Sequence, residues 1–149
     1  MQPEPKQYEQ PEAWAINGQS PPQDVWLRIL QWHIRPVVSI YYAHGIPLVP
    51  SRGSCWRPKE WEEQKGRSGF SLHTFPGRSR GACDLVRADG VKVVSVLDLL
   101  VEQGPWRRIC CYPSSDFIHV DYGDHKGTPC ERRQLFECAG GREPWIRCR

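Results

Sequence analysis

Residues 71–85 read SLHTFPGRSRGACDL, and this stretch places a histidine and an aspartate on either side of one loop. His73 precedes a segment rich in glycine, proline and arginine, and Asp84 stands at the start of an apolar run. Residues 81–86 have the character of a strand that follows the loop. Side chains on two neighbouring backbone segments can form two corners of a metal site, so we examine the rest of the chain for a third.

A third metal ligand is predicted in a hairpin formed by two strands after residue 106. Residues 107–112 (RRICCY) and 117–122 (FIHVDY) read as two strands, joined by a turn of proline, two serines and Asp116. Because side chains of a strand alternate between its faces, His119 and Asp121 share one face. We expect that face to look toward His73 and Asp84.

Two imidazoles and a carboxylate are a suitable donor set for zinc. His73, Asp84 and His119 would leave the fourth position of a tetrahedral ion open, as a catalytic site requires. Each of the three also has an ordinary structural interpretation when it is taken alone: a loop residue, a strand cap and a hydrogen-bonded strand histidine. The sequence pattern by itself leaves both interpretations open.

The remaining elements predict an α+β fold with a small antiparallel sheet and helices packed on it. Apolar residues spaced by three and four predict a helix that Asp24 caps, with Pro36 causing a kink or starting a second helix that ends near Gly45. A short helix is expected to start at Pro58, and further elements are an edge strand at 46–50 and a helix at 94–103.

The chain length of 149 residues fits one domain. The Pro-, Gln- and Glu-rich residues 1–22 predict an extended N-terminal arm, with Trp14 packing back onto the domain. The domain itself is expected over residues 23–123. Residues 124–149 form a cysteine-containing tail that either packs on the domain or trails from it.

Composition argues against several classes of protein. The formal net charge is +3 and no block of five like charges occurs, so binding to nucleic acid is not indicated. No window of eighteen apolar residues is present, which predicts no membrane partner. The N-terminus lacks the basic and apolar regions of a secretory signal, so we expect delivery by another route if the protein acts outside a cytoplasm.

The seven cysteines show no C-x-x-C pair of the zinc-ribbon or thioredoxin type. Cys55, Cys83, Cys110 and Cys111 lie in or beside apolar segments, and we expect them to be buried, reduced thiols. For the three cysteines of the tail, one disulfide and a disordered end remain equal alternatives.

Four segments occur in an order that resembles a known family. They are SRGSCWR (51–57), SLH (71–73), GACDL (81–85) and YPSSDFIHVD (112–121). This order resembles the zinc D-alanyl-D-alanine carboxypeptidases and L-alanyl-D-glutamate endopeptidases of cell-wall metabolism, whose fold the Hedgehog signalling domain shares. The resemblance covers residues 24–123. The chain departs from the family where His73 and Asp84 are eleven positions apart, four more than usual, and where Cys55 replaces a glycine.

The resemblance implies a role for each matching residue. His73, Asp84 and His119 would bind one zinc ion, and Arg57 would bind the scissile carbonyl oxygen or a substrate carboxylate. Ser71 would support His73 or line the substrate site. Asp116 would be the general base, with Asp121 as the alternative base, as a substrate-site residue or as a partner that orients a ligand imidazole.

The function that the resemblance implies is a monomeric zinc metallopeptidase that cleaves peptidoglycan stem peptides. The D-Ala-D-Ala bond, the L-Ala-D-Glu bond and a cross-bridge bond all remain open as the bond that it cuts. Without a signal, such an enzyme fits a phage endolysin held in the host cytoplasm before release, or a virion-associated lysin, that acts at the bacterial cell wall. Two other classes remain: a zinc-binding module of the same fold without catalysis, and a virion or structural protein that binds the cell wall through its basic loop and aromatic residues.

Overall fold

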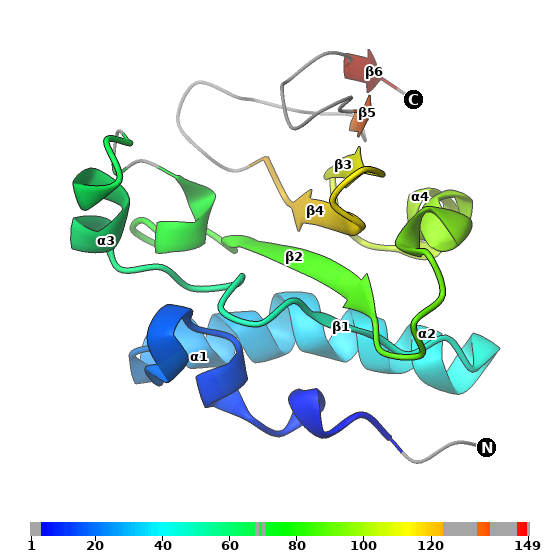
Figure 1. Cartoon of the computed structure of the whole chain (residues 1–149), viewed down its shortest axis with the longest axis horizontal. Helices are drawn as coiled ribbons and strands as arrows, with labels where there is room; N and C mark the ends of the chain where they lie inside the picture. The colour runs from blue at the N-terminus through cyan, green and yellow to red at the C-terminus, as the bar shows by residue number, and fades with distance from the viewer. Residues whose placement is uncertain (1–3, 68, 70, 124–133, 138–145, 149) are drawn as a thin grey trace.

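The computed structural model describes residues 4–67, 69, 71–123, 134–137 and 146–148. Four α-helices and six strands form the regular structure of this part of the chain (Figure 1). The helices are α1 (Gln23–Ile29), α2 (Arg35–His44), α3 (Lys59–Gln64) and α4 (Leu97–Gln103). The strands are β1 (Leu48–Pro50), β2 (Ala82–Arg87), β3 (Arg108–Tyr112), β4 (Phe117–Asp121), β5 (Gln134–Glu137) and β6 (Ile146–Cys148).

The six strands form one sheet in the order β1-β2-β4-β3-β5-β6. The first four pair antiparallel, β5 joins β3 in parallel, and β6 pairs antiparallel with β5. The predicted α+β class with a small antiparallel sheet is therefore confirmed, and β5 and β6 add strands in a region for which the sequence predicted only a tail. Among the described residues, no helix is both long and apolar enough to cross a membrane.

The register of β2, β3 and β4 separates the sheet into two faces. Asp84 pairs with His119, which in turn pairs with Cys110, so these three side chains lie on one face. Their neighbours point to the opposite face, where they are fully buried. That core face is formed by Cys83, Leu85, Ile109, Ile118 and Val120.

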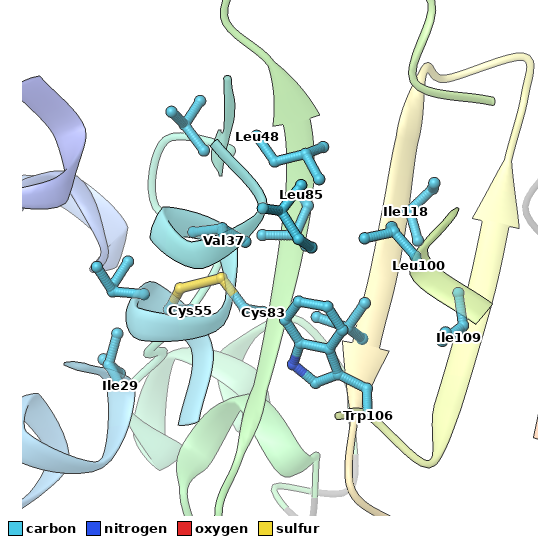
Figure 2. Packing of buried hydrophobic residues seen from close by; sticks show 14 of the residues in the cluster. Ile29, Val37, Leu48, Cys55, Cys83, Leu85, Leu100, Trp106, Ile109 and Ile118 are labelled. Carbon is cyan, nitrogen blue, oxygen red and sulfur yellow. A yellow bond between two sulfur atoms is a disulfide. The ribbon is translucent and has the colours of Figure 1, made fainter. Parts of the chain in front are cut away.

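The helical segment from α1 to α2 covers the core face (Figure 1). Val37 from this segment lies beside Leu85, and Leu100 of α4 lies beside Ile118 (Figure 2); Ile29 and Cys83 belong to the same buried cluster. Each of these side chains has an exposed fraction of 0%. Apolar burial on this face therefore holds the helices to the sheet and fixes which face is left for polar residues.

A π-helical turn, η4 (Leu30–Ile34), joins α1 to α2 and brings Pro36 into the first turn of α2. A proline is tolerated there because the first N–H groups of a helix have no intrahelical acceptor. The helix ends at Gly45, whose positive φ of 68° closes it as predicted. The predicted cap was wrong: Pro22 occupies the N-cap position, and Asp24 instead pairs with Arg28 at 3.0 Å.

Where the sequence predicted an extended arm, the structure has three short 3-10 helices at Lys6–Tyr8, Pro11–Ala13 and Ile16–Gly18. Trp14 lies between them with only 1% of its surface exposed, and its indole N–H donates to the Gln7 carbonyl. The Tyr8 hydroxyl donates to the carbonyl of Leu48 in β1. This N-terminal segment thus contributes two aromatic side chains to the core.

The expectation of reduced thiols was wrong for three cysteines. Cys55 and Cys83 form a disulfide in the core (Figure 2), and Cys110 is also disulfide-bonded. Cys111 is buried with a reduced thiol, as expected. Burial was correctly inferred from the apolar surroundings, but pairing depends on which residues meet in space, and the sequence separation of 28 between Cys55 and Cys83 hides it.

Candidate metal centre

His73, Asp84 and His119 come together on the polar face of the sheet, with one donor atom of each within 4.8 Å of the other two. Asp84 Oδ1 lies 2.9 Å from His119 Nδ1 and 3.5 Å from His73 Nε2. The rings of the two histidines pack edge to face at 5.1 Å. His73 and Asp84 are buried, while 21% of the His119 side chain is exposed. The three residues proposed from sequence therefore form one group.

The ring nitrogens that face away from Asp84 Oδ1 both have acceptors. His73 Nδ1 donates to the carbonyl of Cys55 at 3.1 Å, and His119 Nε2 donates to Asp121 Oδ2 at 2.8 Å. These bonds hold each imidazole with its other nitrogen toward Asp84. A ligand histidine is typically oriented through its second nitrogen in this way.

The donor set can hold a metal ion. Asp84 Oδ1 lies 2.9 and 3.5 Å from the two imidazole nitrogens, and all three donor atoms lie within 4.8 Å of one another, whereas ligand atoms around a tetrahedral zinc lie about 3.3 Å apart. Two imidazole nitrogens and one carboxylate oxygen leave the fourth position free for a small molecule. The described residues can thus hold one metal ion, and the chemistry of the donors favours zinc over magnesium or calcium, which prefer oxygen ligands.

The loop between His73 and Asp84 is held by contacts from the helical segment. Arg28 Nη1 donates to the carbonyls of Phe75, Gly77 and Ser79 at 3.3, 3.1 and 2.7 Å. His33 Nε2 donates to the Arg80 carbonyl at 2.8 Å. These bonds hold the loop in place between its two ends, His73 and Asp84, at the metal group.

A turn at residues 51–57, here called the ligand turn, contacts both His73 and Asp84. Its Ser51 N–H and Ser54 hydroxyl donate to the Asp84 carbonyl, and the Arg57 N–H donates to the His73 carbonyl. Ser71 supports His73 from the other side, because its hydroxyl accepts the His73 N–H at 3.3 Å. The ligands are therefore positioned mainly through backbone groups.

Arg57 lies at the metal group and is paired with two carboxylates. Its Nη2 is 3.2 Å from Asp84 Oδ2, and its Nη1 is 3.4 Å from Glu62 Oε1. Glu62, from α3, is fully buried and also pairs with Arg67 at 3.2 Å. The Arg57 guanidinium lies 5.7 Å from the ring centre of Trp61. In this structure Arg57 orients and neutralises the Asp84 carboxylate.

Asp121 is the second partner of His119 and has no exposed surface. Arg108 holds it by two bonds, Nε to Oδ1 at 2.6 Å and Nη2 to Oδ2 at 2.7 Å. The Gly123 N–H donates to the same carboxylate at 2.7 Å. With this many donors Asp121 is fixed against His119, which matches the orienting role that the sequence left as one of its alternatives.

The ionisation of the group follows from its contacts. Burial raises the pKa of Asp84, but His73 and His119 outweigh it and hold the pKa well below its usual range. The pKa of Asp121 is likewise low, because bonds from His119 and Arg108 exceed the effect of burial. Burial lowers the pKa of His119, yet Asp121 and Asp84 raise it to about 9. Two carboxylates thus favour a positive charge at the position of His119.

Asp116, the proposed general base, lies outside this group. Its Oδ1 accepts the N–H of Val93 at 2.9 Å, and its Oδ2 is 3.8 Å from Lys92 Nζ. Both partners belong to the start of the 3-10 helix η6 (Val93–Val96) or directly precede it. Asp116 has a positive φ of 54° at the β3–β4 turn, which turns it out of the alternation of β4. Its catalytic role stays a prediction.

Three parts of the site were not singled out from the sequence. Arg108 faces Asp121 across the hairpin, and a register count from the turn would have indicated that pair. Cys55 and Cys83 each stand one or two residues from a candidate site residue in SCWR and ACDL, which is a signal for their pairing. Glu62 was also missed, although its partners Arg57 and Arg67 each lie only five residues from it along the chain.

Neither a protein-family model, nor a curated protein, nor a solved structure matches this chain. The function is therefore inferred from the geometry of the metal group and from the residues that support it.

Proposed function

We propose that this chain is a zinc-dependent peptidase that cleaves the stem peptides of peptidoglycan at the bacterial cell wall. The observation that supports the proposal most directly is the group of His73, Asp84 and His119, with both imidazoles oriented by acceptors on their second nitrogens. The order of the four sequence segments supports the choice of a peptide substrate. Carboxypeptidase and endopeptidase specificity are both compatible with it.

The chain's own residues would each perform a simple task. His73, Asp84 and His119 would hold the ion, which when bound supplies Lewis-acid polarisation of a substrate carbonyl and activation of water. Asp121, fixed by Arg108, would keep His119 in the required tautomer. Arg57 would steady Asp84 and, from that position, place a positive charge beside the reacting carbonyl oxygen.

Of the tasks that a peptidase requires, proton transfer has the weakest support from the positions of the side chains. Asp116 stands where the family that the sequence resembles places its base, but its carboxylate accepts a hydrogen bond from the Val93 N–H. For Asp116 to accept a proton from water at the metal group, the β3–β4 turn would have to rearrange when substrate binds. This observation favours one second candidate, a zinc-binding module of the same arrangement that does not hydrolyse peptides.

The first experiment measures zinc per chain, by atomic emission, for the parent, for His119→Ala and for His44→Ala. His44 is an exposed histidine at the end of α2, where it contacts Gln103, so it controls for the loss of any histidine. We expect about one zinc in the parent and in His44→Ala, and much less in His119→Ala. A parent that takes up no zinc would contradict the metal site and leave wall binding as the remaining function.

The second experiment incubates purified peptidoglycan with the zinc-loaded parent and identifies released peptides by mass spectrometry. Hydrolysis would release peptides with new amino groups. Release that stops when a chelator is added and resumes when zinc is restored supports the peptidase. A zinc-loaded chain that releases no peptide would establish the non-catalytic module instead. Binding to peptidoglycan that survives chelation without any cleavage would favour the wall-binding alternative.

A further inference from the structure

The Cys55–Cys83 disulfide lies among the buried side chains on the core face of the sheet (Figure 2), opposite the face that carries Asp84 and His119. Cys83 immediately precedes Asp84 in β2, so the two side chains point to opposite faces of the same strand. Cys55 belongs to the ligand turn. Both cysteines have an exposed fraction of 0%. The disulfide therefore joins, inside the core, the two backbone segments that carry or contact the metal ligands.

The ligand turn reaches the metal group through five hydrogen bonds, two of which come from the N–H and the guanidinium of Arg57. The Cys55 carbonyl accepts from His73 Nδ1 at 3.1 Å, and the Asp84 carbonyl accepts from Ser54 Oγ at 2.9 Å and from the Ser51 N–H at 2.8 Å. A shift of the turn relative to β2 would change the orientation of one ligand and the backbone position of another. The disulfide is a covalent link between the ligand turn and β2.

Reduction would disturb this arrangement for two reasons: it removes the covalent link between the ligand turn and β2, and it leaves two thiols that need more room. It breaks the S–S bond with the addition of two electrons and two protons and leaves two thiols in its place. Two sulfur atoms that are not bonded need more room than a bonded pair, and a core packed at protein density has little room to give. The thiols would therefore push the ligand turn away from β2.

We propose that the Cys55–Cys83 disulfide positions His73 and Asp84 for metal, so that the chain binds zinc tightly only while this disulfide is intact. This inference rests on the metal-binding part of the proposed function. It implies that the site is complete in compartments where disulfides persist, and weakened where cellular dithiols supply the electrons for reduction.

Linkage makes the proposal measurable from two directions. If reduction weakens zinc binding by some factor, zinc must make the disulfide harder to reduce by the same factor. For a two-electron couple, a tenfold factor corresponds to a shift of about 30 mV in the midpoint of reduction. Zinc affinity measured on a variant without the disulfide and reduction measured on the parent should therefore change in the same direction.

The first measurement compares zinc affinity, by competition with a chromophoric chelator, in the parent, in Cys55→Ala/Cys83→Ala and in Leu100→Ala. The double alanine variant removes the disulfide without leaving thiols that would bind zinc themselves. Leu100→Ala removes a fully buried side chain from α4 and controls for lost stability, because it alters no cysteine. We expect at least a tenfold loss of affinity in the double variant and a change within twofold in the control.

The second measurement needs no variant. The parent is equilibrated over a range of reducing potential with and without zinc, and alkylation with mass spectrometry follows Cys55 and Cys83 separately from Cys110. We expect zinc to shift the midpoint of this pair by at least about 30 mV toward more reducing conditions, the equivalent of a tenfold factor.

The outcomes separate this inference from the proposed function. A parent with the disulfide intact that does not bind added zinc would overturn both the proposed metal site and the role of the disulfide. A folded double variant that binds zinc within twofold of the parent, or a midpoint that zinc leaves unchanged, would overturn the role of the disulfide while the metal site stands. If the double variant fails to fold, the midpoint measurement on the parent alone decides.

Discussion

The two faces of the sheet are built on different physical principles. On the core face, Leu85, Ile118 and their neighbours are buried by contact with apolar side chains. On the polar face, Asp84, His119 and Asp121 are also largely buried, but each is held by specific donors and acceptors. Apolar packing tolerates changes of shape at a cost in stability, whereas a hydrogen-bonded group loses its function when one partner is removed.

The largest effect on stability is expected on the core face. Ile118→Ala removes a fully buried side chain from β4 next to the ligand His119. We expect the free energy of unfolding to fall by about 2–5 kcal/mol, because the buried methyl groups are lost and a cavity remains. Urea denaturation measures this loss, and zinc content should stay near that of the parent. Loss of zinc in the folded variant would show that the two faces are not independent.

His33 tests a polar group placed on the core side. Its Nε2 donates to the Arg80 carbonyl and its Nδ1 accepts from Trp106 at 3.1 Å, so only the neutral ring satisfies both contacts. Burial lowers the pKa of His33 to about 4, although Arg80 and Asp121 oppose this and the positive charge of His73 or His119 adds to it.

The sign of the pH effect follows from this lowered pKa. Between pH 4 and the ordinary histidine value, the unfolded chain binds more protons at this site than the folded chain, so stability decreases as the pH falls. We expect protonation at this site to lower the free energy of unfolding by roughly 3 kcal/mol across that range. Denaturation with a chelator present, from pH 7 to pH 4, should show a shallower loss for His33→Gln than for the parent. Equal slopes would contradict the neutral buried state.

Asp121→Asn tests a supporting contact on the polar face. The variant keeps the size of the side chain but removes the charge that faces His119 Nε2 and Arg108. Loss of such a partner typically costs 10- to 100-fold in metal affinity, so we expect zinc affinity to fall by about that factor. Asp116→Asn is the matched control, with an expected change within twofold. A larger effect at Asp116 than at Asp121 would reverse the roles assigned to the two carboxylates.

The smallest effect is expected at the β3–β4 turn. Asp116→Ala removes the acceptor of the Val93 N–H and places alanine at a positive φ of 54°. We expect a loss of about 1 kcal/mol in stability. Asp116→Gly should lose less than Asp116→Ala, because glycine adopts this backbone conformation without strain. Thermal unfolding of the two variants compares them, and equal losses would show that the hydrogen bond alone matters.

Much of the site was predictable because its signals are local. Alternation along FIHVDY placed His119 and Asp121 on one face, and the order of SLH and GACDL suggested that His73 and Asp84 meet them. The strand assignments rest on periodicity over a few residues, which a sequence displays directly. Asp116 was assigned as base from the family resemblance and not from alternation; its positive φ at the turn places its carboxylate at the Val93 N–H, and its role stays a prediction.

The sequence by itself determined the α+β class, the hairpin, the helix end at Gly45 and the types of residue available to hold a metal. Only the tertiary structure decided that Cys55 pairs with Cys83 and that Arg28 holds the long loop at the metal group. The physical reason is distance along the chain. Local patterns record the period of a helix or strand, whereas these contacts join segments that the burial of the core brings together.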